Sequence, residues 1–292
     1  MPLLLGAAVW STRRLAISAP RHGGGRRGTS RWFLRTGPRT PAITGRPGWY
    51  APARAVGART LLTKVRTPRQ AVNTVTALAV GGAVYVLAPV LGTSVDPRIV
   101  VLAGAIHFAV LFDGNNAFGM DGPALWSEVL AGADGRALVQ GKLWSSLVTM
   151  ALPGVLLPLV LAAMTGGWRW VPAGWLVAAG SIGAAAGVAV LSAVLAPFAL
   201  PDSPNPLAGG DTGQGCLAGI MLTGSVIVLG VVSAPVALGI WWASGSSVLF
   251  ATAAALAAPV VGAATLWACT VLATARVQGA EAELLAKVTS GR

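Results

Sequence analysis

Long runs of apolar residues, separated by short polar connections, dominate the chain after about residue 70. Six of these runs hold roughly twenty residues, the length that an α-helix needs to cross the hydrocarbon core of a bilayer. The runs do not alternate apolar and polar residues, as the strands of a membrane β-barrel would. The pattern therefore predicts an all-α integral membrane protein with six transmembrane helices, at residues 71–92, 98–118, 143–165, 171–195, 216–242 and 248–273.

Positive charge is concentrated before the first predicted span. Residues 1–70 hold 14 of the 21 Lys and Arg residues and no Asp or Glu. If both termini lie in the cytoplasm, only Arg98 and Arg169 among the basic residues face outward, as the positive-inside rule favours. The sequence thus predicts a multi-pass protein of the cell membrane with both termini inside. The basic arm has few aromatic residues and no nucleic-acid-binding motif, so we expect no nucleic acid as a partner.

The chain divides into four predicted parts. The composition of the first part, rich in Gly, Pro and Arg, cannot bury enough apolar surface to fold alone, so we expect it to be disordered. The four parts are a basic cytoplasmic arm at 1–48, an amphipathic helix at 49–70, a transmembrane domain at 71–273 and a cytoplasmic tail at 274–292.

The predicted amphipathic helix has apolar residues on one side and basic residues beside them. This arrangement favours a helix that lies in the inner membrane interface and contacts anionic lipid. Pro68 is expected to end it. The apolar positions are Ala58, Leu61, Leu62 and Val65, and the basic ones are Arg59, Lys64 and Arg66.

Small residues four positions apart suggest close contacts between helices. Gly183 and Gly187 form one such pair, and Gly215 and Gly219 form another. Pairs of this kind let helix backbones approach each other in a membrane. In a chain with 38 glycines, such spacing also arises by chance.

The densest polar cluster lies in LFDGNNAFGMDGPALWSEVLAG, residues 111–132. In the six-span topology, Asp113, Asn115 and Asn116 lie at the cytoplasmic end of the second span. They thereby avoid the bilayer centre, where an aspartate costs about 2.5–3.5 kcal/mol. Asp121 is a suitable N-cap for a short amphipathic helix that ends before Gly132.

This short helix offers a surface for a partner protein. We expect Leu125, Trp126 and Val129 to enter an apolar groove on the partner, and Glu128 to contact basic groups at its rim. The alternative is a solvated loop without a partner.

The sequence contains no motif of a known catalytic site. It has neither H-E-x-x-H nor G-x-S-x-G, and in GRALVQGKL the lysine, Lys142, is followed by Leu rather than the Ser or Thr of a phosphate-binding loop. Cys216 and Cys269 lack metal-ligand spacing. We therefore expect no enzyme activity, no cofactor and no metal in this chain.

His107 and Asp113 form a candidate polar membrane site together with Asn115 and Asn116. The histidine and the aspartate are six residues apart and so point to different faces of a helix. A proton or ion relay through these two residues, as in a secondary transporter or channel, is the alternative function.

Three short stretches together resemble a known family. A basic helix ending in T-P-R-Q, a segment N-N-A-F-G-M-D-G-P-A-L-W between two spans, and Q-G-K-L-W opening the next are similar to the permease subunits of type-2 ABC transporters from high-GC bacteria. The resemblance runs from about residue 50 to the end of the chain. The resemblance is to the C-terminal half of the larger members, which implies either a half-size permease or a shortened gene product.

The resemblance implies an exporter permease whose ATP is hydrolysed by a separate ATP-binding-cassette subunit. The segment between the second and third spans would be the coupling helix that docks into this ATPase. A half-size permease would act as a homodimer or pair with a second half. Re-entrant helices before the last span, common in this family, would require a break near Pro235. The residues implied in the coupling turn are Asn116, Phe118, Gly119, Asp121 and Gly122, with Gly141 and Lys142 marking the return to the membrane.

Reporter fusions test this topology. Fusions at residues 40, 130, 206 and 292 should report a cytoplasmic location, and fusions near 95, 168 and 245 an external one, because this orientation keeps most Lys and Arg inside. An external signal at residue 130 would contradict both the orientation and the docking of the short helix.

Overall fold

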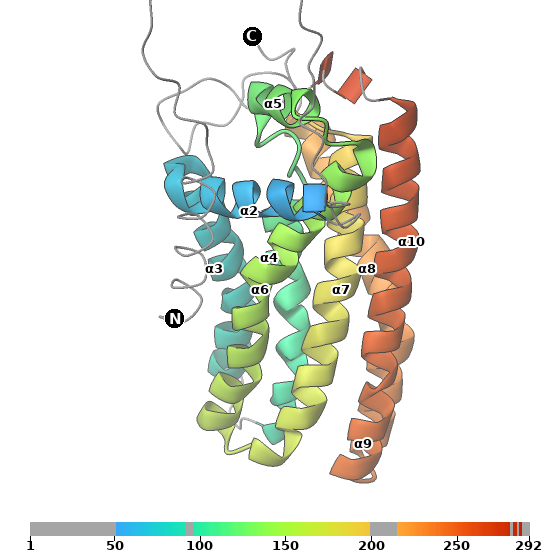
Figure 1. The fold of residues 1–292 in the computed structure, drawn as a ribbon. Coiled ribbons are helices and arrows are strands. Elements are labelled where there is room, and N and C mark those ends of the chain that lie inside the picture. The colour runs from blue at the N-terminus through green and yellow to red at the C-terminus, as the bar shows by residue number, and fades with distance from the viewer. Residues whose placement is uncertain (1–50, 92–95, 199–214, 281–282, 285, 288–292) are drawn as a thin grey trace, which may run out of the picture. The chain divides into compact units, whose positions relative to one another are not determined.

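The computed structural model describes residues 51–91, 96–198, 215–280, 283–284 and 286–287. In these residues every regular element is a helix (Figure 1). The predicted arm at 1–48 and parts of the predicted tail lie outside the described residues. The elements are α2 (Ala51–Arg66), α3 (Pro68–Leu91), η1 (Pro97–Ala105), α4 (Ile106–Gly114), η2 (Gly122–Ala124), α5 (Leu125–Leu130), α6 (Gly135–Thr165), η3 (Trp168–Trp170), α7 (Val171–Leu195), α8 (Gly215–Ser244), α9 (Val248–Ala255) and α10 (Ala257–Gly279).

Four helical stretches among the described residues are long and apolar enough to cross a membrane. They are Gly135–Thr165, Trp168–Leu195, Ala218–Ser244 and Val248–Gly279. These stretches coincide with the last four predicted spans, which is consistent with a multi-pass membrane protein. α8 continues through Pro235 without a break, and the chain is interrupted instead at Leu256, between α9 and α10.

The other two predicted spans are also helical, and the first of them corresponds to α3. The second consists of η1, a 3-10 helix, followed directly by α4. A 3-10 helix rises about 2.0 Å per residue and an α-helix 1.5 Å. The nine residues of η1 and the nine of α4 therefore cover roughly 31 Å, about the thickness of the hydrocarbon core. Because the apolar helical stretch in this region, Ala103–Gly114, is short, the six-span count remains a prediction.

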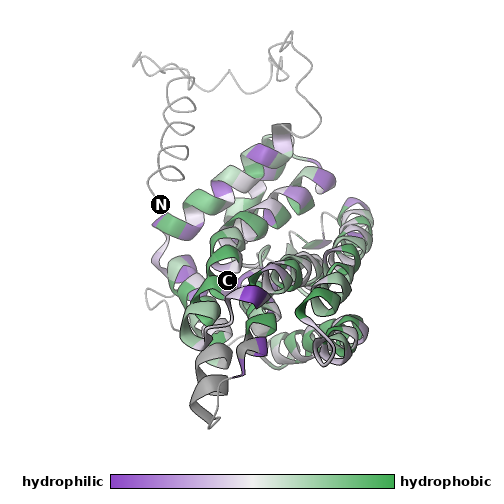
Figure 2. Cartoon of the chain, turned by 90° about the horizontal axis from the view of Figure 1, so that it is seen from below, coloured by the Kyte–Doolittle hydropathy of each residue, from purple (hydrophilic) through white to green (hydrophobic). Residues whose placement is uncertain are grey.

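α7 lies inside the helix bundle and the neighbouring helices surround it. Within the apolar window of each span, 72% of the α7 span is buried but only 11% of the α8 span. Hydrophobic residues cover most of the helices (Figure 2). The outer surfaces of α6, α8 and α10 therefore suit contact with lipid tails. Exposed apolar residues on these surfaces include Val155, Val160, Ile227, Val231, Leu238, Val260, Trp267 and Leu272.

Glycines bring α7 and α10 into close contact (Figure 1). A Cβ atom added at Gly180 would lie 2.3 Å from the carbonyl oxygen of Ala258, and one at Gly262 would lie 2.3 Å from the carbonyl oxygen of Gly180. Gly187 likewise lies against Leu266. The sequence pair that includes Gly187 is thus a packing surface. Gly219, from the other predicted pair, has open space around it.

α2 lies across one end of the bundle and contacts α6 (Figure 1). Its buried side consists of Ala53, Val56, Gly57 and Thr60. The apolar side predicted from the sequence is left partly exposed, and Val65 is 81% exposed. The helix therefore has a narrow small-residue face for the bundle and a second, apolar face that remains free for lipid.

The contact between α7 and α10 can be tested with a pair of alanine substitutions. Gly262→Ala should lower the thermal unfolding midpoint, because its Cβ would lie 2.3 Å from a backbone oxygen and overpacking costs about 1–3 kcal/mol. Gly230→Ala on α8, where a Cβ meets open space, should leave the midpoint unchanged or raise it, because Ala favours helix over Gly. Equal shifts of the two variants in one detergent would contradict the close contact.

Candidate functional site

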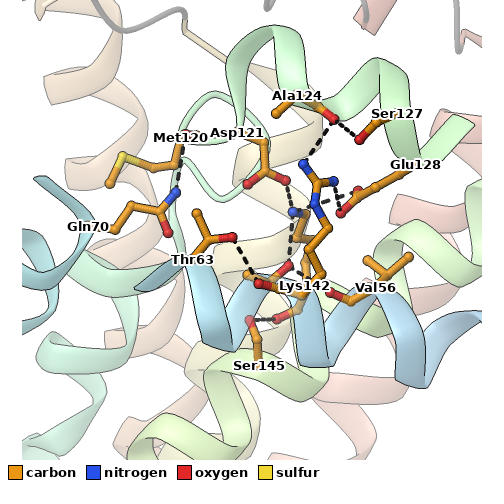
Figure 3. A network of polar contacts seen from close by, with 12 residues as sticks. Val56, Thr63, Gln70, Met120, Asp121, Ala124, Ser127, Glu128, Lys142 and Ser145 are labelled. Carbon is orange, nitrogen blue, oxygen red and sulfur yellow. Dashed lines mark hydrogen bonds and ion pairs between the residues drawn. The ribbon is translucent and has the colours of Figure 1, made fainter. Parts of the chain in front are cut away.

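A cluster of charged side chains lies at the end of the bundle where α2 crosses α6. Its contacts join α2, the segment before η2, α5 and the start of α6 (Figure 3), and a further ion pair connects α2 to the end of α4. We call it the charged cluster and define it by six residues. They are Arg59, Lys64 and Lys142, which are cations, and Asp113, Asp121 and Glu128, which are anions.

Lys142 occupies the centre of the cluster, and its side chain is fully buried. Its ammonium group forms an ion pair with Asp121 and donates a hydrogen bond to Thr60 Oγ1 at 3.1 Å. A carboxylate oxygen of Glu128 lies 3.9 Å away. A buried ammonium group is strongly destabilising unless charges and hydrogen bonds compensate it. These three partners, from three different segments, provide that compensation.

The position of Lys142 depends on the glycine before it. A Cβ at Gly141 would lie 2.5 Å from Val56 Cγ1 and 2.9 Å from the carbonyl oxygen of Ala53. Only glycine therefore lets α2 cross α6 at this distance. The close crossing brings Thr60, one turn after Val56, within hydrogen-bonding reach of Lys142.

Arg59 attaches α5 to α2. Its guanidinium group lies 2.6 Å from Glu128 Oε1 and donates a hydrogen bond to the carbonyl oxygen of Ala124 at 3.1 Å. The contact with Glu128 is an ion pair without the alignment of a hydrogen bond. Burial raises the pKa of Glu128, and the charge of Arg59 acts against this shift. Glu128 is therefore held by charge inside the protein and does not point into solvent.

Asp113 is the acceptor of a second group of contacts. It forms an ion pair with Lys64 of α2 and accepts a hydrogen bond of 2.7 Å from Thr74 of α3. Only 1% of its side chain is exposed. Gln70 and Asn73, at the start of α3, donate hydrogen bonds of 3.3 Å to nearby backbone oxygens. The end of α4 is thus fastened to both α2 and α3.

The segment between α4 and η2 is fastened to the end of α7. The side-chain amide of Asn116 donates to the carbonyl oxygen of Phe198 at 3.0 Å, and the Phe198 N–H donates back at 3.2 Å. Phe118 is fully buried. A Cβ at Gly119 would lie 2.1 Å from the Phe198 oxygen, so this position requires glycine. Gly122 has a φ of 51°, in the left-handed region.

The face of α5 that points outward differs from the predicted one. Leu125 is fully buried and Glu128 is 5% exposed, so neither side chain is available to a partner. Trp126 is 48% exposed and Leu130 79%. Leu125, Glu128 and Val129 share the inner side of this short helix because they are three and four residues apart. Leu125 and Glu128 thus face the protein in this structure while Trp126 is exposed, and contact of α5 with a partner stays a prediction.

His107 and Asp113 belong to different environments. Asp113 lies in the charged cluster, whereas His107 lines a cavity beside Asp96, Arg98 and other residues. Asn115 caps the end of α4 through its backbone N–H. The structure therefore does not bring the four residues of the candidate polar membrane site together. Among the described residues, no group of three or more His, Cys, Asp or Glu has an arrangement suited to a metal ion.

A double-mutant cycle tests the central ion pair. Lys142→Met should lower the free energy of unfolding by about 3–5 kcal/mol, because it leaves Asp121 buried without its cation. Adding Asp121→Asn should recover part of this loss, with a coupling energy of roughly 0.5–3 kcal/mol. Chemical unfolding of the single and double variants in detergent measures the loss of stability and the coupling energy. Additive effects would show that the two side chains do not interact.

The chain matches no protein-family model, no curated protein and no solved structure. The roles of its residues are therefore argued from their contacts alone. These contacts show a charge-balanced junction that attaches a short surface helix to the ends of several membrane helices.

Proposed function

We propose that this chain is the permease subunit of an ATP-binding-cassette exporter, with ATP hydrolysed by a separate subunit that docks on α5. One observation supports this proposal most strongly. Glu128, on the inner side of α5, is paired with Arg59 of α2 and lies 3.9 Å from Lys142 of α6, while Trp126 and Leu130 are exposed on the outer side. A partner that moves α5 would therefore also move the helices to which it is attached.

The attachment of α5 suits the transmission of force. Glu128 is held by Arg59 of α2 and lies near Lys142 of α6, so a displacement of α5 that leaves the other helices in place would separate buried charges. Breaking a buried ion pair costs several kcal/mol. In our proposal, ATP-driven movement of the partner is transferred by this coupling to the start of the α6 span.

The proposal includes the six-span topology with α5 on the cytoplasmic side. α6 begins directly after α5, and the basic residues of α2 lie at the same end of the bundle. Anionic lipid at the inner surface attracts such residues. We further propose that the chain pairs with a second copy of itself or with a second permease half.

A secondary transporter or channel remains the alternative function, with His107 and Asp113 as its relay. The structure gives this alternative little support. Asp113 is already paired with Lys64 and Thr74, and His107 lies in a separate cavity. An ion path through both residues would require the charged cluster to open.

Docking on α5 can be tested by truncating its exposed tryptophan. Buried aromatic side chains commonly dominate protein interfaces. Trp126→Ala should therefore weaken binding of the ATPase by about 2 kcal/mol, or roughly 30-fold, without changing the unfolding midpoint of the chain. Binding is measured with an ATPase subunit that copurifies with the tagged chain and with the permease in nanodiscs.

Trp168→Ala is a matched control, because Trp168 is 58% exposed and lies at the other end of the α6 span. It should bind the ATPase like the unmodified chain. Wild-type affinity of Trp126→Ala would exclude α5 as the docking site. Leu125→Asp is unsuitable for this test, since Leu125 is fully buried and the substitution should unfold the junction.

A further inference from the structure

A large cavity lies in the half of the bundle away from the charged cluster. It has a volume of about 590 Å³ and is bounded by η1 and α4, α7, α8 and α10. Cavities of 300–1,000 Å³ are typical of sites for small molecules. Most of its surface is apolar. Among the lining residues are Val101, Val177, Ala184, Val236, Ile240 and Gly262.

The cavity results from small residues on one side and loose packing on the other. Gly180, Ala184 and Ala258 line it from α7 and α10, where close helix contacts leave no room for larger side chains. α8 forms the opposite wall, and its span is only 11% buried. A helix held by few contacts can move outward to admit a molecule from the surrounding lipid.

Three polar side chains of the cavity lack partners for one or more of their polar atoms. Nδ1 of His107 lies 2.8 Å from the carbonyl oxygen of Gly104, so Nδ1 carries the proton and Nε2 is left as an acceptor. The hydroxyl groups of Ser181 and Ser233 have no hydrogen-bond partner among the described residues. By contrast, Ser225 of α8 bonds back to the carbonyl oxygen of Met221.

The polar groups within the cavity are uncharged. The charged residues of its lining, Asp96 and Arg98, lie at the start of η1 and face each other at 3.6 Å. Their side chains are 60% and 45% exposed, so they mark the end of the cavity nearest to water. A ligand with a net charge would find no opposite charge deeper inside and would be costly to desolvate there.

We propose that this cavity binds an uncharged, predominantly apolar molecule that carries hydroxyl or keto groups, with hydrogen bonds to Ser181, Ser233 and His107. The ligand reaches it from the lipid past α8. Its identity as the exported substrate rests on the proposed function, whereas binding itself does not. Binding can therefore be measured without any ATPase.

The test uses the full chain in nanodiscs and two photoreactive probes. One is hexadecan-1-ol with a diazirine group in its chain, and the other is hexadecane with the same group. Labelling of residues 177–184 and 233–240 by the alcohol probe should fall at least fivefold when unlabelled hexadecan-1-ol is added in excess, but not when hexadecane is added. Labelling of the lipid-facing side of α10 should not respond to either competitor.

Variants distinguish labelling inside the cavity from labelling on the lipid-facing surface. Ala237→Trp fills the cavity and should abolish the competed labelling, whereas Ala234→Trp, on the same helix but outside the lining, should preserve it. Ser181→Ala combined with Ser233→Ala should weaken competition several-fold. The proposal would be overturned if unlabelled hexadecan-1-ol did not reduce the labelling. It would also be overturned if hexadecane reduced the labelling equally well. Either result would leave docking of an ATPase on α5 unaffected.

Discussion

The buried charge of Lys142 is the constraint on which the arrangement at this end of the molecule depends. An ammonium group enclosed by protein must have anions and acceptors close to it. Asp121 and Thr60 meet this need directly, and Glu128 lies nearby. These partners come from the segment after α4, from α2 and from α5, so the requirement of one side chain determines where three segments lie.

Glycines make this arrangement possible. Gly141 lets α2 approach α6, and Gly119 lets the segment after α4 approach the end of α7. Gly180 and Gly262 do the same for α7 and α10 in the apolar part of the bundle. Close backbone contact replaces large side chains in each case. It also leaves the space beside α8 that forms the large cavity.

Hydropathy was sufficient to predict part of this fold. The last four predicted spans coincide with helices long and apolar enough to cross a membrane, and the small-residue pair at Gly183 and Gly187 does lie against α10. A short helix before Gly132 was also predicted, and it is α5. Periodicity could not identify its outer face, because a helix of six residues is too short to show which apolar side faces the bundle.

The ion pairs of the charged cluster could not be predicted from the sequence. Arg59 and Lys64 were assigned to a lipid surface, and Lys142 was noted only for its place in a motif. They pair instead with Glu128, Asp113 and Asp121 across large sequence separations. The local signal for a buried ion pair was a lone lysine, Lys142, at the start of an apolar span. Without the crossing of α2 and α6, nothing indicated which acids would compensate it.

Hydrogen exchange along α5 tests the central role of Lys142 most directly. If its buried ammonium group holds α5 in place, Lys142→Gln should accelerate exchange of the α5 amides at least tenfold, because Asp121 loses the cation that keeps the segment leading into α5 docked on α6. Amides of α7, which lie in the apolar bundle, should keep their wild-type rates. Unchanged exchange along α5 in a folded Lys142→Gln protein would contradict this role of Lys142.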